Sequence, residues 1–252
     1  MDQISAALVC DPGRYRRNNQ DNFIFDGRML PAENQGVDGV STAAMTADQP
    51  VLAAVFDGMG GYSNGELAAF LAADAFFRNG EAAFASGGLD ILMAQIGDSI
   101  CAKAEQLRVN DMGTTAAAVC LRDDQLQLVN LGDSRIYLYR NRRLYRLSED
   151  HTNYAMLEKL GIKNRKPELT QYLGMSREIV LAPYKSKVKL LPGDKLLLCT
   201  DGLYEALEEL TFLRAVRDAG EPEDALRLLL QLAREQGAKD NITAILIAFH
   251  SM

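Results

Sequence analysis

The chain has 252 residues, of which 48% are hydrophobic and 24% charged, the balance of an ordinary soluble globular protein. A net charge of −7 argues against a general nucleic-acid binder, and no apolar run reaches the roughly 18 residues of a membrane span. Four scattered cysteines and only two histidines argue against a zinc cluster and are typical of a reducing compartment. We therefore expect a cytoplasmic protein with no nucleic-acid or membrane partner.

The N-terminal quarter alternates apolar strands with polar loops. A strand at 4–10 ends in an Asp-Pro-Gly turn, and the polar loop that follows carries Arg16, Arg17 and Asp21. Such a loop is equally typical of a solvated surface segment with an exposed ion pair. A short strand follows at 22–25, and 26–50 has turn residues without periodicity, which predicts a surface excursion with at most a short hairpin.

The stretch Val51 to Glu66, VLAAVFDGMGGYSNGE, has an apolar strand that ends abruptly in Asp57. An ionised acid at the tip of a buried strand needs a partner, since burying an unpaired charge costs free energy. The glycines that follow let the backbone approach that partner closely. A cation held by Asp57 and the Gly58 carbonyl is one interpretation, and an ordinary Asp-Gly turn is the other.

Helices and then strands follow this stretch. We predict a helix through 67–77 that ends at Arg78-Asn79-Gly80, and a second helix with an apolar stripe over 89–107. Four strands joined by tight turns come next and predict an antiparallel meander, at 116–121, 125–130, 136–140 and 144–147.

The C-terminal part repeats the strand-to-acid pattern. The segment 148–183 is mostly polar with one short helix at 154–160, and its length predicts a mobile flap. A hairpin is predicted from 188–191 and 195–199, followed by Asp201-Gly202 and by helices at 210–219 and 223–236. Asp240 precedes a last strand at 242–249. Without repeats or a low-complexity linker, we expect a single domain over 1–252.

Three apolar strands therefore carry an acid at one tip, and a fourth has one beside it: Asp57, Asp201, Asp240 and Asp21. A single acid in such a place is usually a cap or a turn residue, but four in one domain indicate a convergent site. Carboxylates gathered in one cleft repel one another and take up protons unless a cation lies between them. A set of oxygen ligands suits Mg²⁺ or Mn²⁺, and two such ions would activate a water for attack on phosphorus.

The sequence resembles the PP2C-type, or PPM, metal-dependent protein serine/threonine phosphatases in their compact bacterial form. Seven stretches carry the resemblance in the family's order: RRNNQDNF, VFDGMGGYSNGE, MGTTAAAV, NLGDSRIYLY, LSEDHT, LLLCTDGLYE and KDNITAILI. The resemblance implies an α+β fold, a four-layer α-β-β-α sandwich of two antiparallel sheets. It also implies hydrolysis of phosphoserine and phosphothreonine by a hydroxide that bridges two Mn²⁺ or Mg²⁺ ions.

The resemblance assigns the metal ligands by position. Asp57 would bridge both ions, and Asp201 and Asp240 would complete one site. Asp21 and the Gly58 carbonyl would serve the other site, largely through water molecules.

Further residues are assigned in the same way. Arg16, five residues before Asp21, matches the family's phosphate-binding arginine. Asp133 matches the acid that helps to hold a third, weaker metal in some members, although a turn residue paired with Arg135 is an equal alternative. The threonines at 114 and 115 resemble a pair near the cleft, for which packing and hydrogen bonding are the first interpretation.

Met59 stands where some relatives have a histidine proposed to protonate the leaving oxygen. Many bacterial members share the methionine, so inactivity does not follow, and a metal-bound water or His151 remains a candidate acid. A catalytically weak or silent domain that acts as a signalling partner is the rival hypothesis. The expected partners are phosphorylated proteins, those of a serine/threonine kinase or a single regulatory protein, and the expected state is a monomer.

Overall fold

We describe a computed structural model, which covers residues 3–46, 49–60, 64–163 and 165–250. Twelve strands form two antiparallel sheets. The first sheet has the strand order β3-β1-β12-β11-β8-β9. Its strands span Gln3–Asp11 (β1), Ser41–Met45 (β3), Arg135–Arg140 (β8), Arg143–Arg146 (β9), Lys195–Cys199 (β11) and Ile242–His250 (β12).

The second sheet has the order β10-β7-β6-β4-β2, and the short strand β5 pairs with the end of β4. Its strands span Asp21–Ile24 (β2), Val51–Met59 (β4), Gly113–Thr114 (β5), Ala116–Arg122 (β6), Gln125–Leu131 (β7) and Tyr184–Lys189 (β10). Six helices complete the described fold: Asn64–Ser86 (α1), Leu89–Leu107 (α2), Tyr154–Lys159 (α3), Asp201–Tyr204 (α4), Glu209–Asp218 (α5) and Pro222–Glu235 (α6).

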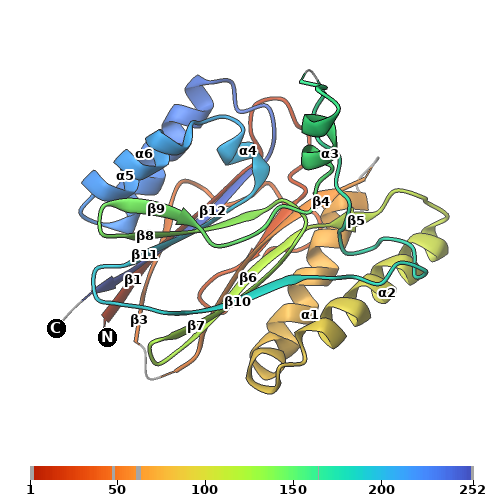
Figure 1. The fold of residues 1–252 in the computed structure, drawn as a ribbon, viewed down its shortest axis with the longest axis horizontal. Helices are drawn as coiled ribbons and strands as arrows, with labels where there is room; N and C mark the ends of the chain where they lie inside the picture. Colours follow the sequence, from red (N-terminus) through yellow and green to blue (C-terminus); the bar gives the residue numbers. More distant parts are fainter. Residues whose placement is uncertain (1–2, 47–48, 61–63, 164, 251–252) are drawn as a thin grey trace.

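The two sheets pack face to face and helices cover both outer faces, with α1 and α2 on one side and α5 and α6 on the other (Figure 1). The sequence encodes these layers in central strands such as β6 and β12, whose residues are buried on both faces instead of one. In β4, Ala53 and Val55 join the core between the sheets, whereas Ala54 and Phe56 pack under α1. The α-β-β-α sandwich predicted from the sequence is therefore confirmed.

The predicted meander is wrong at its centre. Strands β6 and β7 pair as a hairpin, and so do β8 and β9, but the two hairpins belong to different sheets. The tight turn between β7 and β8 at 132–134 carries the chain across the sandwich. The hairpin predicted from 188–191 and 195–199 fails for the same reason, because β10 pairs with β7 and β11 pairs with β8 and β12.

Two further elements differ from the sequence-based expectation. Helix α1 does not end at Gly80 but continues to Ser86. A side chain at position 80 would lie 3.2 Å from Leu52 and from Phe76, so this glycine allows the helix to approach β4 closely. The excursion 26–50 contains a strand, β3, which pairs with β1 and is only half-buried.

Among the described residues, no helix combines the length and the apolar character that crossing a bilayer requires. The four cysteines are free, and all but Cys101 are buried, as expected for small hydrophobic residues in the core.

The ends of β11 and β12 are held together by a close backbone contact. A side chain on Gly202, the second residue of α4, would lie 1.9 Å from the carbonyl oxygen of Asn241. This approach brings Asp201 and Asp240 to the same end of the sheet. Gly202→Ala is expected to lower the free energy of unfolding by about 3 kcal/mol, because the backbone must shift to admit the methyl group. Urea denaturation measures this loss.

Gly220→Ala is the matched control, since nothing lies within 4 Å of the added methyl group. Its free energy of unfolding should stay within about 0.5 kcal/mol of the wild-type value. An equal stability of the two variants would contradict a tight contact at Gly202.

Candidate active site

Six of the seven predicted site residues line one cavity of about 260 Å³, at the end of the sandwich opposite the paired residues Gln3 and His250. They come from the loop after β1, the end of β4, the β7–β8 turn, the start of α4 and the loop before β12. These residues are Arg16, Asp57, Gly58, Asp133, Asp201 and Asp240. Segments far apart in the sequence thus place four carboxylates around one space.

The seventh residue, Asp21, lies beside the cavity and does not line it. It is the register partner of Asp57 in the β2–β4 pair, and it is only 1% exposed. Its carboxylate accepts a hydrogen bond of 2.9 Å from the hydroxyl of Thr200, across the interface of the two sheets. Asp21 is therefore a buried acid behind the cleft, adjacent to Asp57.

Hydrogen bonds fix the strand end that carries Asp57. Its backbone N–H donates to the Thr115 hydroxyl oxygen at 3.0 Å, and its carbonyl oxygen accepts from the Thr115 N–H at 2.9 Å and from the Thr114 hydroxyl at 3.0 Å. The Thr115 hydroxyl is also 2.7 Å from that of Ser134 in the β7–β8 turn. Both threonines are buried, so the interpretation of this pair as packing and hydrogen-bonding residues agrees with the geometry.

Asn241, just before β12 of the first sheet, holds the loop that carries Arg16. The Asn241 side chain donates to the carbonyl oxygens of Pro12 and Asn18 and accepts from the N–H of Gln20. Arg16 itself donates to Asp240 at 2.6 Å and keeps 51% of its side chain exposed. The neighbouring Arg17 is exposed and does not line the cavity, as expected for a solvated residue.

The electrostatics of the cleft favour a bound cation. Burial, followed by the charges of Asp201, Asp21 and Asp133, raises the pKa of Asp57 well above its usual range. Burial also raises the pKa of Asp21 to about 7, and that of Asp133 to about 6. A divalent cation would reverse this preference for protonation, and oxygen donors are the ligands that Mg²⁺ and Mn²⁺ prefer.

The cleft carboxylates line one cavity, and two of them form ion pairs with side chains there. Among the described residues, no three histidine, cysteine or carboxylate side chains have the spacing of a formed metal site. Two carboxylates contact side-chain cations instead: Asp240 contacts Arg16, and Asp201 contacts Lys166 at 3.1 Å. The oxygen donors suit a hard metal cation in chemistry and charge. Displacement of the exposed Arg16 and Lys166 side chains would free Asp240 and Asp201 to bind it.

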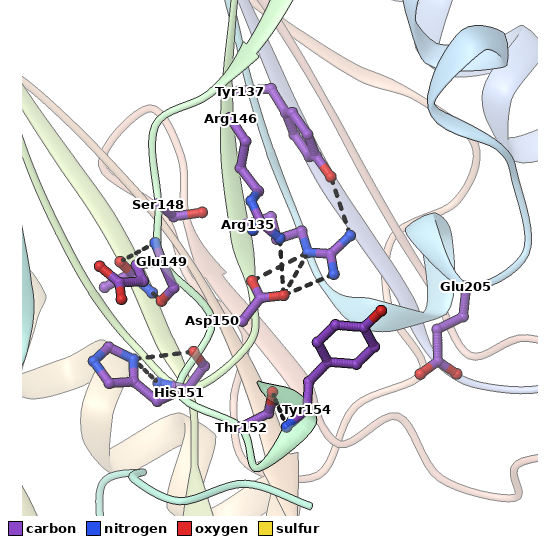
Figure 2. A network of polar contacts seen from close by, with 12 residues as sticks. Arg135, Tyr137, Arg146, Ser148, Glu149, Asp150, His151, Thr152, Tyr154 and Glu205 are labelled. Atoms are coloured by element: carbon purple, nitrogen blue, oxygen red, sulfur yellow. Dashed lines mark hydrogen bonds and ion pairs between the residues drawn. The ribbon is translucent and has the colours of Figure 1, made fainter. Parts of the chain in front are cut away.

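A second cavity of about 650 Å³ adjoins the cleft and shares Asp133, Lys166 and Pro167 with it. Its wall is a network in which Asp150 accepts hydrogen bonds from both Arg135, at 2.7 Å, and Arg146, at 2.9 Å (Figure 2). Arg135 thus pairs with Asp150. These contacts disfavour the alternative in which Asp133 is a turn residue paired with Arg135.

His151 lies outside the lining of the cleft. Its Nδ1 is 3.2 Å from the carbonyl oxygen of Gly132 and its Nε2 is 3.2 Å from that of Ala182, so it ties the flap to the β7–β8 turn. It does not line the cleft, whereas Met59 does. This geometry disfavours His151 as the acid that protonates a leaving oxygen.

Comparisons with known proteins identify the family. The model of the family described as protein phosphatase 2C matches residues 38–246. The chain belongs to this family. A curated relative of the phosphatase 2C chain, the serine/threonine phosphatase stp of Listeria monocytogenes, is 27% identical over 262 residues, which cover 97% of this chain and 95% of the relative.

Solved structures of similar sequence share the fold. The serine/threonine phosphatase PstP of Mycobacterium tuberculosis matches with a TM-score of 0.79 and 26% identity over 99% of this chain and all of that one. Another PstP structure, of the catalytic domain in complex with 2 manganese ions, has a TM-score of 0.77 and 27% identity, and covers the same shares of the two chains. PppA of Pseudomonas aeruginosa, described as a key regulatory component of T6SS, has a TM-score of 0.78 and 26% identity over 97% of each chain.

In this phosphatase 2C chain, sequence reasoning missed three residues that build the cleft. Thr200 and Asn241 adjoin the predicted acids in CTDG and KDNI, so their positions in the motifs were a usable signal. Lys166 had no signal, because it lies in the polar flap 35 residues before its partner Asp201.

Proposed function

We propose that this cleft hydrolyses phosphoserine and phosphothreonine in proteins, with two divalent cations as cofactors. The observation that carries the proposal is the convergence of four carboxylates and Arg16 on one cavity, with the buried Asp21 beside it. The family and the named relatives support the same reaction. We further propose that residues 1–252 form one catalytic domain, with 148–183 as a flap beside the site.

The carboxylates divide between two metal sites. Asp57 would contribute to both sites, Asp201 and Asp240 would complete one of them, and Asp21 with the Gly58 carbonyl would serve the other, largely through water molecules. Asp133 adjoins the cleft from the β7–β8 turn and is the residue for a third ion. Bound divalent cations supply a water of lowered pKa and neutralise charge on the phosphoryl group, and Mn²⁺ and Mg²⁺ both suit these oxygen donors.

The chain's own residues bind and orient the substrate. Arg16 reaches the cleft from a half-exposed position, and its planar guanidinium suits two phosphate oxygens at once. The hydrogen bonds of Thr114 and Thr115 keep the β4 end, and hence Asp57, in place. No histidine lines the cleft among the residues described, and we assign protonation of the leaving oxygen to a water molecule.

The rival hypothesis of a silent signalling domain has little support, because every predicted acid is present and relatives with 26% to 27% identity are named phosphatases. The substrates that we propose are phosphoproteins made by a serine/threonine kinase, and a single dedicated phosphoprotein is the second candidate. The monomeric state and the cytoplasmic location stay predictions from the sequence.

The experiment that tests the function is a panel of phosphoserine, phosphothreonine and phosphotyrosine peptides assayed with Mn²⁺, with Mg²⁺ and with a chelator. We expect release of phosphate from the first two peptides with either metal, and none with the chelator. Phosphate release that survives the chelator, or a protein that releases none under any condition, would overturn the proposal.

Arg16→Ala is expected to lower kcat/KM for a phosphothreonine peptide about 10- to 100-fold, because it removes a charge-assisted hydrogen bond to phosphate. Steady-state kinetics with saturating Mn²⁺ measure this effect. Arg17→Ala is the matched control, since Arg17 is exposed next to Arg16 and does not line the cleft. Equal losses in the two variants would assign the effect to net charge and not to Arg16.

A further inference from the structure

Lys166 reaches the cleft from the flap. It precedes Pro167, which disfavours a helical backbone at position 166. Just beyond it, the segment is attached to the stretch after His151: the N–H of Glu168 donates to the side-chain oxygen of Asn153 at 2.9 Å, and the N–H of Asn153 donates to the Glu168 carbonyl oxygen at 3.0 Å. The backbone that carries Lys166 is therefore placed by hydrogen bonds, while its side chain keeps 61% of its surface exposed.

The Lys166 ammonium contacts two carboxylates of α4 and the residue that follows it. It lies 3.1 Å from an oxygen of Asp201 and 3.0 Å from one of Glu205. Asp201 is an acid of the metal site and is 13% exposed, whereas Glu205 is 47% exposed and lies outside the cleft lining. Glu205 thus holds Lys166 at the mouth of the cleft independently of Asp201.

Arg16 and Lys166 are the only cationic side chains among the described residues that line the cleft. Each of them pairs with one of the carboxylates that would hold metal, Arg16 with Asp240 and Lys166 with Asp201. A divalent cation on these carboxylates would compete for their negative charge, so Arg16 would lose its pair with Asp240 and Lys166 its pair with Asp201. Glu205 would still hold Lys166 at the cleft mouth. A phosphate monoester brings up to two negative charges into the same space.

We propose that Lys166 is a second phosphate-binding residue, released from Asp201 by metal binding and turned to the phosphoryl group of the substrate. The inference rests on the proposed function and adds a residue from the flap to it. The lysine side chain suits such an exchange, since it is a mobile point charge on a flexible stem. Lys166 therefore has two opposite effects: it competes with the metal for Asp201, and it strengthens binding of the phosphorylated substrate.

The two effects, on metal affinity and on substrate affinity, have opposite signs and can be measured separately. In Lys166→Met, isothermal titration of the substrate-free protein should show Mn²⁺ binding about two- to fivefold tighter, because an exposed ion pair no longer competes. The KM for a phosphothreonine peptide at saturating Mn²⁺ should rise about three- to tenfold, because a charge-assisted contact is lost. Lys166→Arg keeps the charge and should return KM to within about twofold of the wild-type value.

Lys163→Met is the matched control, a lysine of the same flap that is exposed and does not line the cleft. It should leave both constants unchanged. If Lys166→Met bound both metal and peptide more weakly, Lys166 would have a structural role. If the KM of this variant were unchanged, Lys166 would not contact the substrate. Either result overturns the proposal.

Failure of the proposed function is a separate outcome, because the wild-type protein would then hydrolyse no peptide. In that case titration of the Mn²⁺-loaded protein with inorganic phosphate replaces KM. Tighter Mn²⁺ binding together with weaker phosphate binding in Lys166→Met would support the role of Lys166, and any other pair of results would overturn it.

Discussion

Asp57→Asn is expected to reduce Mn²⁺-dependent release of phosphate from a small aryl phosphate roughly a thousandfold or more, a loss of about 4 kcal/mol in transition-state stabilisation. Asp57 lies among Asp21, Asp133, Asp201 and Asp240, whose charges all raise its pKa. This central position supports our proposal that Asp57 would contribute to both metal sites. An amide at this place keeps the shape of the side chain but removes the negative charge that holds the cations.

The folded structure should survive this substitution. The hydrogen bonds that fix position 57 involve its backbone N–H and carbonyl, so they remain in the variant. Removing a buried charge should leave the melting temperature of the metal-free protein equal or higher. Circular dichroism and thermal melting check this, and the upward shift that Mn²⁺ gives the wild-type protein should be lost.

Asp124→Asn provides the control for the change from acid to amide. Asp124 lies in the β6–β7 turn, with 41% of its side chain exposed and an ion pair to Lys189. The activity of the Asp124→Asn variant and its response to Mn²⁺ should match those of the wild-type protein. Full activity of Asp57→Asn in the same assay would contradict a metal-dependent mechanism at this site.

The site acids could be found from the sequence because their signal is local. An aspartate at the tip of an apolar strand is visible without knowledge of the fold: Asp57 and Asp201 close such strands, and Asp240 precedes one. Their convergence also has a local cause, since antiparallel strands that enter and leave the same end of a sandwich bring their ends together. The pairing of Asp21 with Asp57 is one such consequence of register.

The connections between sheets could not be found in this way. The turn at 132–134 and the turn at 192–193 have the glycine, proline and aspartate residues of tight hairpins, yet each joins strands of different sheets. Turn chemistry fixes a local change of direction and leaves the choice of partner strand to packing. Only the burial of β8 and β11 against α5 and α6 decides that they lie in the first sheet.

Contacts between the flap and the cleft had no local signal either. Lys166 and Asp201 are joined by an ion pair at the cavity mouth, and neither the spacing nor the periodicity of the flap indicates it. The network of Arg135, Arg146 and Asp150 is a similar case, since its side chains join strands β8 and β9 to the base of the flap. Such contacts depend on the tertiary fold, and sequence patterns report mainly secondary structure.

The burial of Asp21 makes the stability of the metal-free protein depend on pH. The pKa of Asp21 is raised from 3.8 to about 7 in the folded state. Below pH 3.8 the carboxyl is protonated in both states, and the folded state is not penalised. As the pH rises towards 7, the unfolded chain loses this proton and the folded chain keeps it, so the free energy of unfolding falls. One pKa unit corresponds to 1.36 kcal/mol, which sets the total loss at about 4 kcal/mol.

Asp21→Asn should abolish this penalty. In the presence of a chelator, the variant should match the wild-type protein near pH 4 and exceed its free energy of unfolding at pH 7.5 by up to about 4 kcal/mol. The Thr200 hydroxyl can still donate to the amide oxygen, so the local contact persists. Urea denaturation between pH 4 and pH 8 measures the difference, and a variant less stable than wild type at pH 7.5 would contradict a buried, uncompensated carboxylate.

Mn²⁺ should reverse the order of the two proteins. A bound cation stabilises the ionised carboxylate, so the wild-type protein should gain most at pH 7.5, where the penalty of the metal-free state is largest. Asp21→Asn lacks the charge and should gain less. The acid that weakens the metal-free fold at neutral pH is therefore the same group that couples its stability to the cofactor, and the Mn²⁺-induced shift in melting temperature should grow as the pH rises from 5 to 7.5.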